Sequence, residues 1–309
     1  MRIVITEFMD APAVAALAGA HDTHYLPDLV DRPEALAAES ADADALIVRN
    51  RTQVRGALLA GARRLRVVGR LGVGLDNIDV AACKTRGIAV IPASGANAQA
   101  VAEYVIGAAL VLLRGAYGSS ADVAAGHWPR TALSSGREIA GRTLGVVGFG
   151  DIGRRVARLG RALGMRAIAH DVAVPAHSTL WRDEGVEPRD LDALFAAADV
   201  VTLHVPLVEA TRRLIDARAL ASMRRGAILV NTSRGGVVDE AALAASLASG
   251  HLGGAALDVF EHEPLPAGSA LADVPNLLLT PHVAGLTQEA NQRVSTMIAE
   301  RVLATLAGR

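Results

Sequence analysis

Short apolar segments alternate with helix-like segments along almost the whole chain. Apolar runs bounded by turn residues predict strands. We expect strands at Arg2–Thr6, Ala45–Val48, Arg66–Gly69, Ile88–Ile91, Thr143–Gly148, Arg166–His170, Asp199–His204, Ala227–Asn231, Gly254–Val259 and Leu277–Thr280. The sequences between them predict helices, among them Ala11–Gly19, Pro33–Ala41 and Val80–Arg86. This alternation predicts an α/β protein with parallel sheets, and the last six strands match a complete doubly wound nucleotide domain.

Two further segments predict long helices that link the halves of the chain. Ala98–Arg114 is apolar along most of its length, interrupted by Gln99 and Glu103. A helix of this composition is too apolar to face water on all sides, so we expect it to be buried between domains or in a dimer interface. Gln288–Ala307 predicts a terminal helix.

The segment Val146–Gly153 contains the most informative motif, in which an apolar strand leads through three spaced glycines into a helix. In a βαβ unit that binds a dinucleotide, Gly148 permits the tight turn and Gly150 lets the backbone approach a pyrophosphate. Gly153 lets the helix pack closely on the strand. The helix that begins near Asp151 directs free N–H groups and the positive end of its dipole at the phosphates.

An acidic residue is placed to read the ribose. Asp171 lies eighteen residues beyond Gly153, at the end of the next apolar run. Its carboxylate can accept hydrogen bonds from the ribose diol of NAD and would repel the 2′-phosphate of NADP. No arginine follows it closely. The pattern therefore favours NAD over NADP as the cofactor.

Composition limits the partners and the compartment. The chain has 309 residues, 51% of them hydrophobic, and a formal net charge of −1. The length suggests about two domains, and the near-neutral charge gives no reason to expect nucleic acid or a membrane as a partner. The single cysteine, Cys83, suits a reducing compartment. Met1–Ile5 resembles a core strand rather than a signal peptide, and Val105–Leu113 is too short to span a bilayer. We expect a soluble cytoplasmic protein.

Three polar clusters follow successive strands, at Asn231–Gly236, Asp258–Pro264 and Thr280–Gly285. Ligands of open α/β sheets bind outside the carboxyl ends of the strands. Arg234 could hold a carboxylate through two parallel N–H···O bonds, although a surface ion pair is the commoner role of an arginine. His282 could act as a general acid–base if a carboxylate orients its ring.

The partner of His282 is not decided by spacing. On chemistry alone Glu261, His262 and Glu263 compete for this role. A single histidine is most often structural, but three such clusters at successive strand ends favour a catalytic site. A metal site made from His262, His282 and the acids has weak support, because the chain has no HxxxH or CxxC spacing. We expect no metal.

Together these motifs resemble those of the D-isomer-specific 2-hydroxyacid dehydrogenases, a family that includes phosphoglycerate dehydrogenases and hydroxypyruvate reductases. The matching stretches span nearly the whole chain: Gly69–Asp79, Gly148–Gly153, His204–Leu207, Asn231–Gly236, Asp258–Pro264 and Thr280–Gly285. The continuation Gly285–Asn291, with Leu286 after the last motif, is similar to some 3-sulfolactate dehydrogenases of this family.

The resemblance implies two doubly wound parallel-sheet domains. A Rossmann NAD domain at residues 98–285 would be inserted in a smaller flavodoxin-like substrate domain at residues 1–97 plus 286–309, with the active site in the cleft between them. The resemblance assigns Arg234 as the binder of the substrate carboxylate, Glu263 as the partner of His282, and His282 as the acid–base.

The same resemblance implies two sets of binding residues. The cofactor-binding residues are Gly148, Gly150, Asp151, Ile152, Gly153, Asp171, His204, Pro206, Thr211, Thr232, Asp258, His282 and Gly285. The substrate-binding residues are Arg49, Asn50, Arg51, Val73, Gly74, Asn97 and Arg234, with Val73 and Gly74 acting through their backbone N–H groups.

The expected function is hydride transfer between NAD(H) and C2 of a small 2-hydroxy or 2-oxo acid. A second anionic or polar group is expected on the substrate, of the 3-phosphoglycerate, hydroxypyruvate or sulfolactate type, and Arg49 or Arg51 could meet it. The long apolar helix favours a homodimer. The alternative is an NAD-sensing, corepressor-like binding protein of the same fold, since such proteins can retain the triad. A formate dehydrogenase is disfavoured, because that pattern has Gln where this chain has Glu263.

Overall fold

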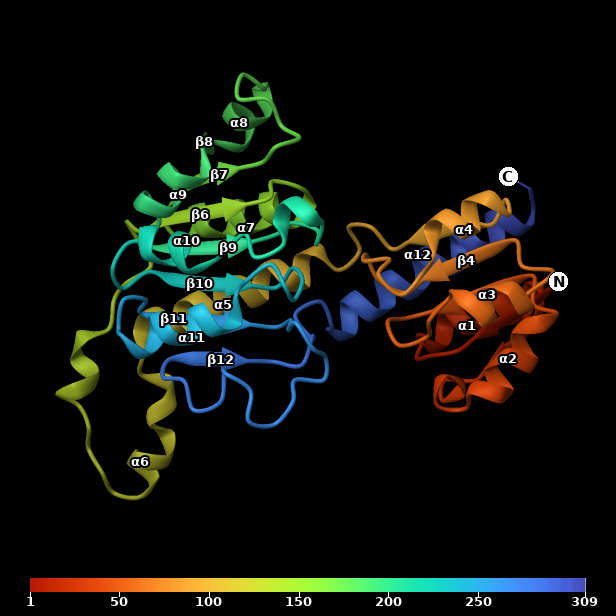
Figure 1. The fold of residues 1–309 in the computed structure, drawn as a ribbon, viewed down its shortest axis with the longest axis horizontal. Helices are drawn as coiled ribbons and strands as arrows, with labels where there is room; N and C mark the ends of the chain where they lie inside the picture. The colour runs from red at the N-terminus through yellow and green to blue at the C-terminus, as the bar shows by residue number, and fades with distance from the viewer. Residues whose placement is uncertain (309) are drawn as a thin grey trace. The chain divides into compact units, whose positions relative to one another are not determined.

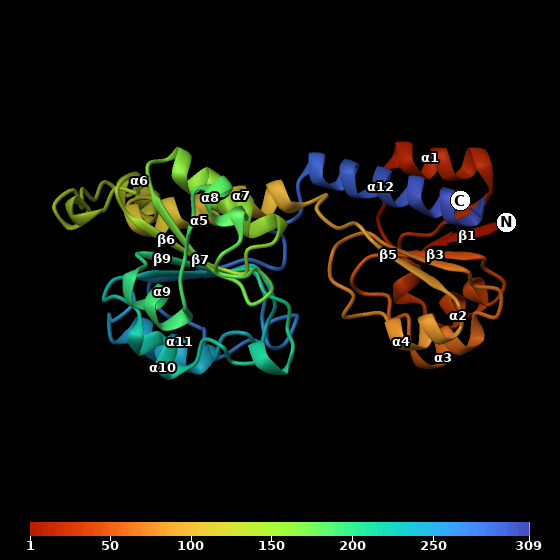
Figure 2. The same ribbon diagram turned by 90° about the horizontal axis from the view of Figure 1, so that it is seen from above.

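The computed structural model describes residues 1–308, and the chain divides into two compact units. The first unit combines Met1–Asn97 with Leu286–Arg309, and the second comprises Ala98–Gly285. Each unit contains one parallel β-sheet with helices on both of its faces (Figure 1 and Figure 2). The predicted α/β class with two parallel sheets is confirmed.

The sheet of the first unit has five strands in the order β2-β1-β3-β4-β5, which is the flavodoxin-like order. Its strands are β1 (Arg2–Ile5), β2 (Asp22–Tyr25), β3 (Ala45–Val48), β4 (Val67–Arg70) and β5 (Ala89–Pro92). Its helices are α1 (Ala11–Ala20), η1 (Leu29–Asp31), α2 (Pro33–Ala41), α3 (Gly56–Gly61), α4 (Val80–Thr85) and α12 (Gln288–Leu306). Helices α1 and α12 cover one face, and α2, α3 and α4 cover the other (Figure 2).

The end of the chain completes the core of the first unit. Helix α12 packs against α1, β4 and β5 and buries Ile298 and Val302. Gly69 in β4 allows this close approach, because a Cβ atom at Gly69 would lie 2.7 Å from a methyl carbon of Ile298. A segment far away in the sequence therefore supplies one layer of this unit.

Strand β2 is the element of this sheet that hydrophobic patterning misses. Its sequence, Asp-Thr-His-Tyr, contains no apolar run, and none of its four residues is buried. It pairs with β1 at the edge of the sheet. An edge strand can be held by backbone hydrogen bonds on one side without apolar side chains on both faces, so patterning gives no signal for it.

The sheet of the second unit has seven parallel strands in the order β12-β11-β10-β9-β6-β7-β8. From β8 to β11 this is the doubly wound dinucleotide-binding order, and β12 extends it by one strand. The strands are β6 (Thr143–Val147), β7 (Arg166–His170), β8 (Glu187–Pro188), β9 (Val200–Leu203), β10 (Ile228–Asn231), β11 (Gly254–Leu257) and β12 (Leu277–Leu279). The helices are α5 (Ala98–Arg114), η2 (Tyr117–Ser119), α6 (Ser120–Ala124), η3 (Ala132–Ser135), α7 (Asp151–Ala162), α8 (Thr179–Glu184), α9 (Leu191–Ala197), η4 (Glu209–Thr211), α10 (Ala217–Ser222) and α11 (Glu240–Ala248).

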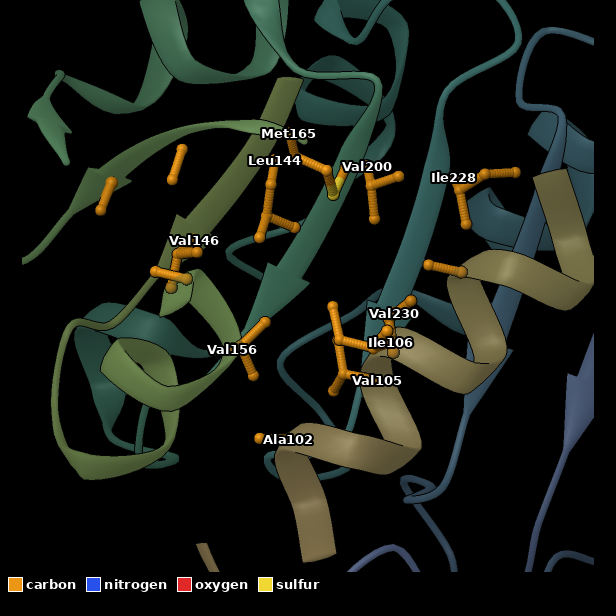
Figure 3. Close-up of a cluster of buried hydrophobic side chains, with 14 of the residues drawn as sticks. Ala102, Val105, Ile106, Leu144, Val146, Val156, Met165, Val200, Ile228 and Val230 are labelled. Atoms are coloured by element: carbon orange, nitrogen blue, oxygen red, sulfur yellow. The ribbon is translucent and has the colours of Figure 1, made fainter. Parts of the chain in front are cut away.

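Helix α5 is buried inside the second unit itself. It packs against α7, β10 and β11, and its apolar side chains face the sheet, among them Ala102, Val105 and Ile106 (Figure 3). Each large aliphatic side chain buried in this way contributes about 1.5–3 kcal/mol. The apolar character of this helix is explained by the core of its own unit, and its place in a dimer interface stays a prediction.

Among residues 1–308, no single helix is long and apolar enough to cross a membrane. The pair Ala98–Arg114 and Tyr117–Ala124 reaches that length and composition only when taken together, with a bend of 72° between the two helices.

Candidate active site

Five loops follow the carboxyl ends of neighbouring strands in the second unit. Because all of these strands are parallel, the loops meet at one edge of the sheet, where ligands bind in doubly wound folds. They follow β6, β9, β10, β11 and β12 and comprise residues 148–153, 204–207, 231–236, 258–264 and 280–285. Every sequence motif of the second unit singled out above therefore lies at this edge, which we call the carboxyl edge.

The glycine turn after β6 depends on close backbone contacts. Gly148 has a positive φ of 93°, and a Cβ atom there would lie 2.4 Å from the carbonyl oxygen of His204. At Gly153 a Cβ atom would lie 2.1 Å from the carbonyl oxygen of Gly148. At Gly150, by contrast, a Cβ atom would meet nothing within 4 Å in the described part of the chain. The backbone of the turn is so closely packed that only glycine fits at Gly148 and Gly153. Gly150, in contrast, leaves open space beside the start of α7.

Asp171 is tied to this turn through its carboxylate. One of its oxygens accepts the Phe149 N–H at 2.6 Å, and the other accepts the Ala173 N–H at 2.7 Å. The carboxylate is thereby fixed beside the glycine turn, where it can still accept hydrogen bonds from a hydroxyl. Asp151, at the first position of α7, forms an exposed ion pair with Arg154 at 2.6 Å.

The loop after β9 carries a neutral histidine. His204 Nε2 lies 3.0 Å from Thr202 Oγ1, and burial lowers the pKa of His204 to about 3. The Thr211 hydroxyl donates to the Pro206 carbonyl at 2.6 Å and accepts the Val208 N–H at 2.9 Å, so it closes the turn of this loop.

Two buried polar atoms near these loops are unsatisfied. Within residues 1–308, neither His204 Nδ1 nor the Thr232 hydroxyl oxygen has a hydrogen-bond partner. Buried polar groups in native proteins are almost always paired. Groups left unpaired at a ligand-binding edge are therefore available to a bound molecule.

The loop that carries Arg234 is folded by a nearby side chain. Asn231 Oδ1 accepts the Ser233 N–H at 3.0 Å and its hydroxyl at 2.7 Å, while Asn231 Nδ2 donates to the Arg234 carbonyl at 3.0 Å. Arg234 Nη1 donates to the Ser233 carbonyl at 2.6 Å. Asparagine side chains commonly organise turns in this way.

This loop lies directly against the loop after β11. A Cβ atom at Gly235 would lie 1.7 Å from the carbonyl oxygen of Phe260, so only glycine fits there. The Glu261 N–H donates to Glu240 Oε1 at 2.7 Å, which ties the same loop to the start of α11. The backbone beside Arg234 and the backbone leading to Glu263 are consequently fixed relative to each other.

A histidine and a carboxylate form a direct pair at this edge. His282 Nδ1 lies 2.8 Å from Glu263 Oε2, and Glu263 Oε1 accepts the Phe260 N–H at 3.1 Å. This contact selects Glu263 from the three candidates, whereas Glu261 lies 3.9 Å from Arg213. A carboxylate only accepts, so the Nδ1 atom of His282 carries the proton and Nε2 is left for proton exchange. The side chain of His282 is 39% exposed, so a substrate can reach it.

His282 has a positive φ of 57°, an uncommon backbone conformation for a residue with a side chain. The loop is anchored by Asp258, which is 1% exposed. Its two carboxylate oxygens accept the Val283 and Ala284 N–H groups, each at 2.8 Å, and Oδ1 also accepts the Thr280 hydroxyl at 2.6 Å. Gly285, the last residue of the second unit, follows this anchored segment.

The candidate substrate residues of the first unit lie in three places. Arg49, Asn50 and Arg51 follow β3, Val73 and Gly74 follow β4, and Asn97 ends the first segment of this unit. Asn50 is exposed, and Val73 is 39% exposed. Within residues 1–308 the side-chain oxygen of Asn97 is buried and has no hydrogen-bond partner.

The loop after β3 is organised by a buried carboxylate. Glu7 is 5% exposed and accepts backbone N–H groups from Arg49 at 2.8 Å, Arg51 at 3.2 Å and Thr52 at 3.0 Å. Asn77 donates to the Arg49 and Thr52 carbonyls at 3.2 and 2.7 Å. A long-range set of hydrogen bonds therefore determines the path of this loop.

The two arginines of this loop differ in their surroundings. Arg49 donates to Asn291 Oδ1 at 2.6 Å and lies 5.7 Å from the centre of the Phe8 ring. Burial lowers the pKa of the Arg49 guanidinium, which nevertheless stays charged at neutral pH. Arg51 forms an ion pair with Asp31 and thereby lowers the pKa of the Asp31 carboxyl. The charge of Arg51 is thus partly neutralised within the chain.

Comparison with known proteins identifies the family. A model of the NAD-binding domain of D-isomer specific 2-hydroxyacid dehydrogenases matches residues 106–284. The chain is 52% identical over 307 residues to the (S)-sulfolactate dehydrogenase of Chromohalobacter salexigens, covering 99% of each chain. The chain belongs to the D-isomer-specific 2-hydroxyacid dehydrogenases.

Two further relatives agree with this assignment. The chain is 37% identical to a hydroxypyruvate reductase of Thermotoga maritima, over 99% of this chain and 98% of that protein. The crystal structure of a D-lactate dehydrogenase from Aquifex aeolicus, complexed with NAD and lactic acid, matches with a TM-score of 0.85 and 30% identity, over 99% of this chain and 96% of that chain. The predicted family, an NAD-dependent 2-hydroxyacid dehydrogenase activity and NAD as the cofactor are confirmed.

The carboxyl edge of this dehydrogenase fits NAD. The open space at Gly150 lies beside the first turn of α7, where free N–H groups can meet phosphates. Asp171 is fixed at the neighbouring strand end, and the unsatisfied Thr232 hydroxyl and His204 Nδ1 are available for polar groups of the dinucleotide. The groups available at this edge are polar, so they fit a nucleotide better than an apolar ligand.

Sequence reasoning missed several residues that organise the site. Glu7, Glu240 and Tyr104 hold loops through hydrogen bonds to distant partners, and so does Thr280, whose motif was recognised but whose bond to Asp258 was not expected. The available signal for Glu7 was a lone acid directly after the first core strand. For the others the partner lies 21 to 176 positions away, and nothing in the local pattern indicates it.

Proposed function

We propose that this dehydrogenase acts on a small 2-hydroxy acid whose C3 carries a second anionic group, and that sulfolactate is the best-supported substrate. The observation that carries the proposal is Arg49. The hydrogen bonds of its guanidinium go to neutral acceptors, the Asn291 amide and the Phe8 carbonyl. The Glu7 carboxylate acts on Arg49 through space and not through a hydrogen bond to the guanidinium, so the guanidinium can still bind a sulfonate. The 52% identity to an (S)-sulfolactate dehydrogenase over 99% of both chains supports the same substrate class.

Arg51 is the weaker candidate for this role. Its guanidinium pairs with both oxygens of Asp31, one of them at 3.2 Å. A substrate anion would have to compete with that carboxylate. Arg49 is thus proposed as the residue that recognises the second anion, while Asn50 and Arg51 line the same loop, and Val73, Gly74 and Asn97 are proposed to contact the remainder of the substrate.

The chemistry follows from the proposed roles of three side chains. NAD, when bound, accepts the hydride from C2 of the hydroxy acid or returns it to the oxo acid. Arg234 binds the C1 carboxylate and fixes C2 in position. In oxidation, Nε2 of neutral His282 takes the hydroxyl proton as the C2–O bond becomes a carbonyl. Glu263 holds Nδ1–H and stabilises the imidazolium that forms. In reduction, protonated His282 returns the proton to the carbonyl oxygen.

The cofactor contacts are proposed from the arrangement of the carboxyl edge. Gly148, Gly150, Asp151, Ile152 and Gly153 would meet the pyrophosphate, and Asp171 the adenosine ribose. The proposed contacts of the rest of the dinucleotide are His204, Pro206, Thr211, Thr232, Asp258, His282 and Gly285. Residues 98–285 are accordingly proposed as the cofactor domain, and residues 1–97 with 286–309 as the substrate domain.

A substrate panel tests the proposal. Purified enzyme should be assayed with NADH and NADPH on 3-sulfopyruvate, 3-phosphohydroxypyruvate, hydroxypyruvate, glyoxylate and pyruvate. We expect the highest kcat/KM for 3-sulfopyruvate with NADH, and we expect Arg49→Ala to raise KM for 3-sulfopyruvate and 3-phosphohydroxypyruvate much more than for pyruvate. Equal kcat/KM for sulfopyruvate and pyruvate would contradict the proposed substrate class. NADH binding without turnover of any 2-oxo acid would instead favour the corepressor-like alternative.

We also infer that the protein is a homodimer, on the basis of an excursion between α5 and β6. This arm, residues 115–136, projects from the second unit (Figure 1), and its base is closed by the Arg137 N–H donating to the Leu113 carbonyl at 2.8 Å. Three large apolar side chains on it are exposed: Tyr117 at 66%, Val123 at 45% and Trp128 at 77%. Apolar side chains gathered on one projecting segment are typical of a contact surface.

Sedimentation tests the dimer. The wild-type chain should sediment as a dimer, and a Tyr117→Ser/Trp128→Ser double variant should shift toward the monomer. A monomeric wild type at micromolar concentration would contradict the inference. The cytoplasm is the compartment we propose, since the one cysteine, Cys83, is a buried free thiol, and fractionation of cells that express the natural protein would test it.

A further inference from the structure

Three side chains far apart in the sequence form a chain of hydrogen bonds beneath the His282 loop. The Tyr104 hydroxyl of α5 lies 2.6 Å from Thr280 Oγ1. The Thr280 hydroxyl donates to Asp258 Oδ1 at 2.6 Å. The Asp258 carboxylate in turn accepts the Val283 and Ala284 N–H groups. These hydrogen bonds therefore connect a core helix, through two strand ends, to the two residues that follow His282.

The direction of every bond in this chain is determined by chemistry. A carboxylate can only accept, so the single proton of the Thr280 hydroxyl is directed to Asp258. The Thr280 oxygen must then accept from Tyr104, whose phenol is the donor. Burial raises the pKa of the Tyr104 phenol, so this donor keeps its proton at neutral pH. Successive bonds aligned in one direction strengthen one another in a low-dielectric environment.

The backbone at His282 needs the support of these hydrogen bonds. His282 has a φ of 57°, which is unfavourable for a residue with a Cβ atom and persists when surrounding interactions determine it. The Asp258 bonds hold the two following N–H groups, and the Glu263 bond holds the imidazole Nδ1. The backbone anchor and the side-chain anchor together leave Nε2 in one orientation.

We propose that Tyr104 and Thr280 are positioning residues, which act through Asp258 to hold the backbone of His282 in the conformation that aims Nε2 at the substrate. This role rests on the proposed function of His282 as the acid–base. Neither residue touches substrate or cofactor in this proposal. Their loss should lower kcat by displacing the imidazole.

A matched pair of variants at Thr280 provides the sharpest test. Thr280→Val preserves shape but removes the hydroxyl, and Thr280→Ser retains it. We expect kcat to fall roughly tenfold in Thr280→Val, because a hydrogen bond to a charged group is lost and the catalytic geometry shifts. Thr280→Ser should stay within about twofold of the wild type. Thr305→Val, at an exposed hydroxyl of α12 that bonds the Arg301 carbonyl, is the control for a general threonine-to-valine effect.

A double-mutant cycle tests whether Tyr104 acts through Thr280. Tyr104→Phe removes only the phenolic hydroxyl and should lower kcat less than Thr280→Val does. In the double variant, Tyr104→Phe should add nothing further, since its hydroxyl acts through the threonine. Additive effects of the two changes would overturn the proposed chain.

Backbone exchange supplies a readout independent of turnover. Hydrogen–deuterium exchange of peptides covering residues 281–286 should be faster in Thr280→Val and Tyr104→Phe than in the wild type and Thr280→Ser. Unchanged exchange in this segment would overturn the proposal, and so would a lowered Tm with unchanged kcat per folded enzyme. If the wild type reduces no 2-oxo acid, the proposed function fails, while the exchange data still decide whether this chain of bonds holds the loop.

Discussion

The two loops that carry the proposed substrate-binding arginines are held in different ways. The Arg234 loop, in the second unit, is folded by Asn231 three positions away and by the close contact of Gly235 with Phe260. The Arg49 loop, in the first unit, is held by the buried carboxylate of Glu7, which lies 42 positions away from Arg49. The first loop depends on local turn chemistry and backbone shape, whereas the second depends on long-range hydrogen bonds, most of them to one buried carboxylate.

We expect the two regions to have different roles in the enzyme. The carboxyl edge of the second unit holds the groups proposed for the reaction itself, and changes there should affect every substrate alike. The Arg49 loop holds a cation proposed for the second anion, so changes there should alter the choice between substrates more than the reaction rate.

The largest effect is expected for His282→Asn. Asparagine retains a polar side chain but provides no acid–base group, so kcat should fall by about 10²–10⁴-fold for all 2-oxo acids. The Kd for NADH, measured by fluorescence titration, should stay close to that of the wild type. His262→Asn, which changes a histidine of the neighbouring loop, is the matched control. Full activity of the His282→Asn enzyme would contradict the proposed role of His282 as the acid–base.

Gly235→Ala should have the next largest effect. The added methyl would lie 1.7 Å from the Phe260 carbonyl oxygen, so the Arg234 and Glu263 loops must separate. We expect kcat to fall by about 10²-fold and the free energy of unfolding to fall by about 1–3 kcal/mol. Steady-state assays and denaturant titration measure the two quantities.

The control for this change is Gly19→Ala in α1, because within residues 1–308 a Cβ atom at Gly19 meets nothing within 4 Å. That variant should keep the activity of the wild type, and its free energy of unfolding should be equal or up to about 1 kcal/mol higher, because alanine favours the helix. A Gly235→Ala enzyme with normal kcat would mean that the relative placement of the two catalytic loops does not limit the reaction.

Glu7→Gln tests whether the Arg49 loop controls the choice of substrate and not the reaction rate. The amide oxygen of glutamine can still accept the Arg49 and Thr52 N–H groups, as Oε1 of Glu7 does now, but the NH₂ group in place of Oε2 cannot accept the Arg51 N–H, so the Arg49 loop should lose part of its anchor. We expect KM for sulfopyruvate to rise by about tenfold, with kcat for pyruvate nearly unchanged. Glu34→Gln, at an exposed position of α2, is the control. Equal losses on both substrates would show that the loop does not discriminate between them.

The last prediction concerns the choice of cofactor. Asp171→Ala removes the carboxylate that is proposed to bind the ribose diol, so the ratio of kcat/KM for NADH to that for NADPH should fall by about ten- to a hundredfold. The catalytic loops are not involved, and kcat with saturating NADH should be retained. An unchanged ratio would mean that another group reads the ribose.

Much of the site could be predicted because its motifs are local. The glycine turn of residues 148–153 and the strands that precede the catalytic loops follow from patterns confined to a few neighbouring residues. The partner of His282 could not be derived from spacing, because Glu261, His262 and Glu263 share one short loop. The 2.8 Å contact with Glu263 depends on how that loop meets the end of β12.

The sequence by itself determined the alternation of strands and helices, the nucleotide fingerprint and the chemical types of the catalytic groups, because each is encoded in neighbouring residues. Only the tertiary structure decided that α5 is buried in its own unit, that β2 joins the edge of a sheet, and that Glu7 and Tyr104 support loops distant in sequence. The physical reason is that burial and hydrogen bonding depend on proximity in space, and proximity between distant segments exists only after the chain has folded.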